Sequence, residues 1–143
     1  MQTIKHLFHI ESSVESVFES LTDISKLKQW YTNKISGDAG ENGEVIFHFG
    51  EMNLTSHVTN FVQNKTVSWK TTEASIPIVG HVITFHLDRN NDKTRVRFEH
   101  KGFENLDDSF ANMNYSWAKY LESLRQLCQK GVGEAFGSKN YRS

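Results

Sequence analysis

The chain has 143 residues, with 16 Lys and Arg against 17 Asp and Glu and a formal net charge of -1. This balance excludes the basic excess that is typical of nucleic-acid-binding proteins. A hydrophobic fraction of 37% suffices for the core of one domain, and no apolar run is long enough to span a bilayer. The single cysteine, Cys128, excludes an internal disulfide, and the N-terminal residues lack the layout of a signal peptide. We therefore expect one cytoplasmic domain without a membrane-inserted segment.

The N-terminal part combines a strand with two short helices. Residues 3–10 show the composition of a strand. Ser12 and Glu15 fit a capping box, in which the Ser12 hydroxyl accepts a hydrogen bond from a first-turn amide. This pattern predicts one short helix, and Asp23 begins a second one with Trp30 on its inner side.

The middle of the chain has the alternation of β-strands. A glycine-rich segment at 37–43 predicts a loop, after which the hydrophobic period changes to two. Strands are expected at 44–49, 53–61, 66–71, 81–87 and 94–100. The segment 73–80 contains the only proline, Pro77, and is expected to interrupt the strand pairing. The last two strands form a hairpin around residues 88–92.

The last strand predicts its own orientation. Val96, Phe98 and His100 share one face, and the charged Arg95 and Arg97 lie on the other. Burying several charges would cost far more than exposing two apolar side chains. We therefore expect Val96, Phe98 and His100 to face the interior.

A long amphipathic helix follows, opened by Asp107 and Asp108 and ended by Gly131 and Gly133. Its apolar stripe consists of Phe110, Met113, Trp117, Leu121, Leu124 and Cys128. The order of elements predicts an α+β fold, in which a curved antiparallel sheet wraps around the C-terminal helix. We expect one domain over residues 1–133 and a short, loosely held tail over 134–143.

Several segments resemble a known family. The block 14–23, continued by Leu27 to Tyr31, is similar to the opening of the START-like (SRPBCC) superfamily. The similarity is greatest to its branch named after the activator of the ninety-kilodalton heat-shock protein ATPase. Segments 43–47 and 94–103, and Trp117 in the last helix, agree in order. Tyr31 stands where a second tryptophan is common. The resemblance implies a helix-grip fold with two short helices after the first strand and a cavity between sheet and long helix.

The resemblance does not imply one function, because members of the superfamily bind lipids, hormones or aromatic molecules and a few are enzymes. Since a helix across a curved sheet can leave a hollow, we expect a binding module for a small lipid-like or aromatic molecule. The side chains expected to line its cavity face inward from the strands and the long helix. They are Phe47, Phe49, Trp69, Phe85, Val96, Phe98, His100, Met113, Trp117 and Leu121. His100 is the polar member, and it needs a hydrogen-bond partner from the protein, water or ligand.

Two alternatives remain open. A cyclase- or dehydratase-type enzyme would need paired polar groups inside the cavity, and His100 is the one inward titratable group that the pattern offers. A chaperone-linked interaction module would need an exposed apolar patch on the outer sheet face. The charges of Arg95, Arg97 and Glu99 instead favour contact with solvent there.

The histidines and the cysteine do not form a metal site. His6 and His9 are three residues apart on a strand, and His81 and His86 are five apart, so the members of each pair face opposite sides. Cys128 lies on the apolar stripe and is expected to be a small buried hydrophobic residue. We expect no metal, no cofactor and no catalytic residue, and a chain that is a monomer or a weak homodimer.

Overall fold

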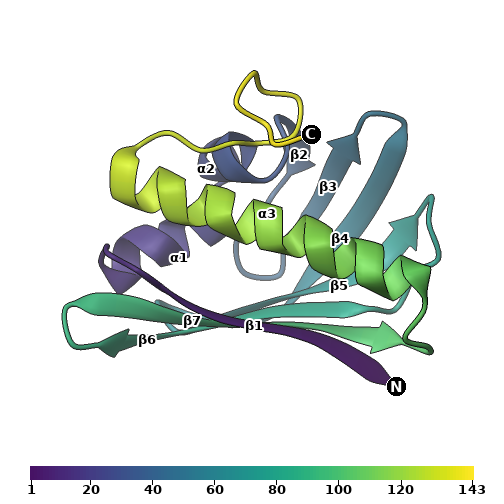
Figure 1. Cartoon of the computed structure of the whole chain (residues 1–143), viewed down its shortest axis with the longest axis horizontal. Helices are drawn as coiled ribbons and strands as arrows, with labels where there is room; N and C mark the ends of the chain where they lie inside the picture. Colours follow the sequence, from purple (N-terminus) through teal and green to yellow (C-terminus); the bar gives the residue numbers. More distant parts are fainter.

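The computed structural model describes all 143 residues. Seven antiparallel strands form one sheet in the order β1-β7-β6-β5-β4-β3-β2, and a long helix, α3, crosses one face of it (Figure 1). The strands are β1 (Gln2–Ile10), β2 (Lys34–Gly37), β3 (Glu44–Phe49), β4 (Met52–Val62), β5 (Thr66–Ala74), β6 (Val82–Asn90) and β7 (Lys93–Phe103). The helices are α1 (Val14–Thr22), α2 (Ile24–Trp30) and α3 (Asp108–Lys130). The expected α+β helix-grip architecture is confirmed. No helix is both long and apolar enough to cross a membrane.

The register of β7 agrees with the alternation in its sequence. Val96, Phe98 and His100 are all buried on the side of α3. Arg95 and Arg97 lie on the outer face, where both contact the Asp88 carboxylate of β6. The β6–β7 turn is tighter than the five residues expected. It closes at Asn91, whose positive φ of 61° is a conformation that asparagine tolerates.

The first helix begins one residue later than predicted. Its N-cap is Ser13, whose hydroxyl accepts from the Ser16 amide, so the assignment of Ser12 as the cap is wrong. The Ser12 carbonyl instead accepts a hydrogen bond from the Thr94 hydroxyl. The neighbouring serines offer the same capping chemistry, and the tertiary contact of Ser12 decides between them.

Strand β2 was not predicted. It lies between α2 and the segment expected to be a loop, overlaps that segment only at Gly37, and pairs with β3. Ile35 is its one buried side chain, and a four-residue strand with a single inward residue has no period to detect.

Helix α3 has clear signals at both ends. The Asp107 side chain caps it by accepting from the Phe110 amide at 3.0 Å. Gly131 ends it in the left-handed region, with φ of 80°. Between these residues, Trp117, Leu121 and Leu124 are buried toward the sheet and the short helices.

The tail, residues 134–143, packs against the domain, although we expected it to be loosely held. The Phe136 amide donates to the Tyr31 carbonyl and the Asn33 amide donates to the Phe136 carbonyl. The Phe136 ring lies 5.6 Å from Phe49, and Tyr141 stacks on Tyr120 at 6.2 Å. Its few aromatic residues therefore anchor the tail beside the N-terminal end of β2 (Figure 1).

Candidate functional site

Tyr31 is the centre of an aromatic cluster under α3. It is the C-terminal cap of α2, and the end of that helix directs its ring into the interior. Its ring stacks on Trp117 at 5.4 Å with an interplanar angle of 13°. The rings of Phe49 and Tyr120 meet it edge-on, at 5.0 and 5.1 Å. Tyr31 therefore contacts the sheet and the long helix at the same time.

A hydrogen-bonded relay lies next to this cluster. The Trp117 indole N–H donates to His100 Nδ1 at 2.9 Å, so the neutral His100 ring carries its proton on Nε2. Nε2 donates in turn to His81 Nδ1 at 3.0 Å. Burial, with a smaller contribution from His81, lowers the pKa of His100 to about 3. Burial also lowers the pKa of His81, against the opposing charge of Glu104. Both rings are therefore neutral near pH 7.

Gly102 makes room for the relay. Its φ of 133° lies in the region that favours glycine, and a Cβ atom there would approach the His81 ring to 2.6 Å. A side chain at this position would displace His81 from His100.

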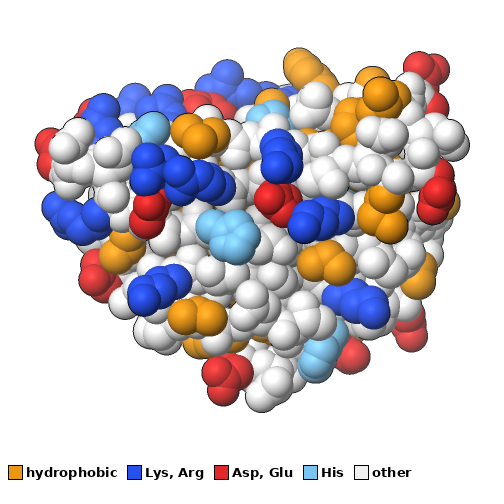
Figure 2. All heavy atoms as spheres, turned by 90° about the horizontal axis from the view of Figure 1, so that it is seen from below, with side chains coloured by type: hydrophobic (Ala, Val, Ile, Leu, Met, Phe, Trp, Pro, Cys, Tyr) orange, Lys and Arg blue, Asp and Glu red, His pale blue; other side chains and the backbone are white.

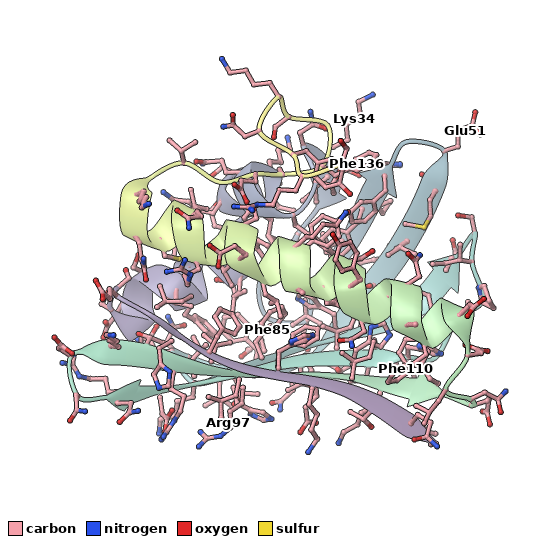
Figure 3. All side chains as sticks on the ribbon, in the orientation of Figure 1. Lys34, Glu51, Phe85, Arg97, Phe110 and Phe136 are labelled. Carbon is pink, nitrogen blue, oxygen red and sulfur yellow. The ribbon has the colours of Figure 1, made fainter.

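A cavity of about 260 Å³ lies between the N-terminal half of α3 and the sheet. Figure 3 shows the dense layer of side chains between α3 and the sheet, with Phe110 at the N-terminal end of the helix. Ten of the 15 lining residues are hydrophobic. The walls come from α2, β3, β4, the β5–β6 connection, β6, β7 and α3. The lining residues are Tyr31, Phe49, Met52, Leu54, Ile76, Pro77, Ile78, Ile83, His100, Ser109, Asn112, Met113, Ser116, Trp117 and Tyr120.

The cavity contains no charged side chain. His100 is its one imidazole, and both ring nitrogens are bound by the relay. Burial raises the pKa of Tyr31 and of Tyr120 far above the usual range, so both hydroxyls stay protonated. No group of three or more His, Cys, Asp or Glu residues is arranged to hold a metal. The cavity can therefore offer apolar contact and neutral hydrogen bonds.

The structure separates the ten residues expected to line the cavity into two sets. Phe49, His100, Met113 and Trp117 border it. The other six are buried in the core outside its walls: Phe47, Trp69, Phe85, Val96, Phe98 and Leu121. Phe98 packs on Trp117 at 4.5 Å and on Phe85 at 5.1 Å, which leaves no space between sheet and helix there. The cavity lies instead between the N-terminal half of α3 and the β5–β6 connection.

The remaining walls could not be found from the sequence pattern for two reasons. Ile76, Pro77 and Ile78 lie in a segment interpreted only as an interruption of the sheet, although apolar residues in a connection are a signal of burial. On α3, Ser109, Asn112 and Ser116 lie beside the apolar stripe, and a polar helix position is ordinarily a solvated one.

Comparisons with known proteins give the same architecture. A solution structure of the Aha1 dimer from Colwellia psychrerythraea is 34% identical, covers 93% of this chain and 100% of that chain, and has a TM-score of 0.86. SSP2350 from Staphylococcus saprophyticus is 18% identical, covers 92% of this chain and 95% of that chain, and has a TM-score of 0.76. CalU16 from Micromonospora echinospora is 15% identical, covers 87% of this chain and 73% of that chain, and has a TM-score of 0.72. At these lower identities the last two show the shared fold alone.

A search of the curated proteins finds no match. The family model described as "Activator of Hsp90 ATPase homolog 1-like protein" matches residues 11–129, which include both short helices, every strand except β1, and nearly all of α3. The resemblance inferred from the sequence is thereby confirmed, and the chain belongs to the family of Activator of Hsp90 ATPase homolog 1-like proteins.

Proposed function

We propose that the chain binds a small apolar or aromatic molecule in the cavity under α3. The observation that carries the proposal is a hollow of about 260 Å³ in which ten of the 15 lining residues are hydrophobic. Protein interiors are close-packed, with few voids larger than a water molecule. Ligand sites are typically concave and mostly apolar, with a few polar groups that orient the ligand.

The access route supports reversible binding. Ser109 and Asn112 of α3 and Pro77 of the β5–β6 connection border the cavity and are exposed. Met52 and Met113 are half-buried beside them, and flexible methionine side chains adapt to ligands of different shape. A ligand can therefore enter between α3 and the β5–β6 connection.

Acid–base catalysis has less support than binding. His100 is the one lining residue that ordinarily titrates near neutral pH, and Trp117 and His81 occupy both of its nitrogens. A cyclase or dehydratase would need a free acid or base at the ligand.

The outer sheet face gives little support to an apolar docking surface. Figure 2 shows Lys and Arg side chains interspersed with isolated hydrophobic ones on this side of the molecule. Leu7 of β1 and Val62 of β4 are exposed, but they belong to strands at different positions in the sheet. Single exposed apolar residues are normal for a protein surface.

Self-association has separate support. The Colwellia Aha1 protein is described as a dimer. We propose a weak homodimer for this chain, located in the cytoplasm as its single cysteine suggests. Light scattering across a dilution series should show a mass that falls from dimer to monomer, and a constant monomer mass would contradict the dimer.

Native mass spectrometry of freshly purified protein tests the binding function. A co-purifying small molecule, lost on denaturation, is the expected result. Fatty acids, flavonoids and aromatic polyketides should then be titrated while tryptophan emission is recorded. Trp117 borders the cavity, whereas Trp30 is buried outside its walls. Trp117→Phe should therefore abolish the ligand-dependent change and Trp30→Phe should retain it. Absence of both an adduct and any emission change would overturn the proposal.

A further inference from the structure

We propose that Tyr31 determines which ligands the cavity accepts, by donating a hydrogen bond from its hydroxyl to an uncharged oxygen on a flat aromatic molecule. The inference rests on the proposed binding function and adds to it the chemical class of the ligand.

The Tyr31 hydroxyl has no hydrogen-bond partner in the protein and, unlike the Trp69 indole nitrogen and the Thr71 hydroxyl, it is not fully enclosed. The residue is only 4% exposed and makes no side-chain hydrogen bond, although it borders the cavity. Two of the indoles beside Tyr31 are paired: the Trp30 indole donates to the Ser20 carbonyl and the Trp117 indole donates to His100. A ligand oxygen in the cavity can therefore accept from this hydroxyl, for a net gain of roughly 0.5–1.5 kcal/mol.

Two fully buried groups also lack partners, but they lie outside the walls of the cavity. The Trp69 indole nitrogen and the Thr71 hydroxyl are buried and unpaired, and neither residue borders the cavity. Of these three unpaired groups, the Tyr31 hydroxyl is the one on a residue that borders the cavity. Its burial keeps the hydroxyl protonated and so makes it a donor.

The shape of the site favours a flat ligand. Tyr31 and Trp117 are stacked almost parallel, and Phe49 and Tyr120 present their rings at steep angles to Tyr31. Aromatic surfaces prefer offset-stacked or edge-to-face contact with another ring. The aliphatic side chains of Leu54, Ile78 and Ile83 complete the wall formed by the sheet and the β5–β6 connection.

The electrostatics exclude a charged ligand. No lining residue carries a charge, so a bound carboxylate would lose its hydration without gaining a counter-ion. At the exposed side, Asn112 and Ser116 make no side-chain hydrogen bond within the protein and can bind a second neutral polar group of the ligand.

Three probes of similar shape separate these contributions: 2-acetonaphthone, 2-ethylnaphthalene and 2-naphthoate. We expect the ketone to bind wild-type protein roughly three- to tenfold more tightly than the hydrocarbon, as one net hydrogen bond allows. The carboxylate should bind most weakly. Calorimetric titration measures the affinities, and the infrared carbonyl stretch of the bound ketone should move to lower wavenumber.

Tyr31→Phe is the decisive variant, with Tyr115→Phe as its control because Tyr115 is 67% exposed. Tyr31→Phe should equalise the affinities of the ketone and the hydrocarbon and should abolish the shift of the carbonyl stretch. It should also melt close to the wild-type temperature, because the hydroxyl that it removes makes no hydrogen bond within the protein. A purely structural tyrosine would instead lose stability without a change in preference. Tyr115→Phe should change neither the preference for the ketone nor the shift of the carbonyl stretch.

The outcomes distinguish this inference from the binding function. If ketone and hydrocarbon bind wild-type protein equally, or if Tyr31→Phe keeps the preference and the carbonyl shift, the role of Tyr31 is overturned while binding stands. If the carboxylate binds most tightly, the uncharged ligand class is overturned. If none of the probes binds, the binding function and the role of Tyr31 fall together. Should Tyr31→Phe fail to fold, the wild-type preference and carbonyl shift still decide.

Discussion

At the level of single residues, the buried histidine pair couples stability to pH. The pKa of His100 falls from 6.5 to about 3 in the folded protein because of burial. Below pH 6.5 the unfolded chain binds a proton that the folded chain excludes, so stability is complete above this pH and is lost as the pH falls. We expect the free energy of unfolding to drop by up to about 1.4 kcal/mol per pH unit through His100 alone. Urea titrations between about pH 7.5 and 4.5 measure the slope.

A pair of glutamine variants isolates this effect. His100→Gln keeps a hydrogen-bonding group between Trp117 and His81 but removes one titrating imidazole, so the slope should shrink by about one proton. His86→Gln is the matched control, because it makes the same replacement at an exposed position on the outer face. An unchanged slope in His100→Gln would show that another group controls the acid response.

Phe98 provides a test of packing at the same scale. Its side chain is 1% exposed, contacts Trp117 and Phe85, and borders no part of the cavity. Phe98→Ala should therefore cost the roughly 3–5 kcal/mol typical of a solidly packed phenylalanine. Arg97→Ala, on the outer face of the same strand, should change stability by only about 0.5 kcal/mol. Denaturant unfolding measures both, and equal small losses would place free volume behind Phe98.

At the level of elements, long periodic segments could be predicted from the sequence and short ones could not. The alternation along β7 and the apolar stripe of α3 extend over many residues, so a local exception does not obscure the pattern. Strand β2 has one buried residue and gives no pattern. The tail also has no periodic pattern in its sequence, because Phe136 and Tyr141 pack individually against aromatic partners.

The cavity was harder to predict than the fold for a physical reason. Core and cavity wall are built from the same apolar side chains, so Phe49 and Phe47 look alike in the sequence although only Phe49 borders the hollow. What separates them is where α3 stays away from the sheet. Part of the wall there comes from the β5–β6 connection, whose Ile76 and Ile78 lie outside the regular strands.

Two glycines after α3 test how the helix end is held. Gly131 has φ of 80° and open space where a Cβ atom would lie, so Gly131→Ala should cost only backbone strain of about 1 kcal/mol. A Cβ at Gly133 would come within 2.2 Å of the Gln29 carbonyl oxygen of α2. Gly133→Ala should therefore cost clearly more, because the tail must move away from α2. Thermal unfolding of both variants ranks them, and the reverse order would contradict the observed contact.

At the level of the whole molecule, one continuous core holds the chain together. A single cluster of 28 buried hydrophobic residues includes members from β1 through α3. The two ends of the chain are tied into it as well, since β1 pairs with β7 and the Phe136 backbone bonds to Tyr31 and Asn33. This continuity predicts a single cooperative unfolding transition that needs no covalent or metal cross-link.

The stability of the domain should therefore resist chelators and reductants. No cluster of His, Cys, Asp and Glu is arranged for a metal, and Cys128, the one cysteine, can form no internal disulfide. The Cys128 thiol lies against the Ser20 hydroxyl at 3.5 Å, and burial raises its pKa, so it is a poor nucleophile. EDTA or dithiothreitol should shift the melting temperature by no more than a few degrees, because neither reagent removes a folding contact. Cys128→Ser serves as the control for dithiothreitol, since any thiol-dependent shift must vanish in it. A larger drop with EDTA would reveal a structural metal that binds outside any such cluster.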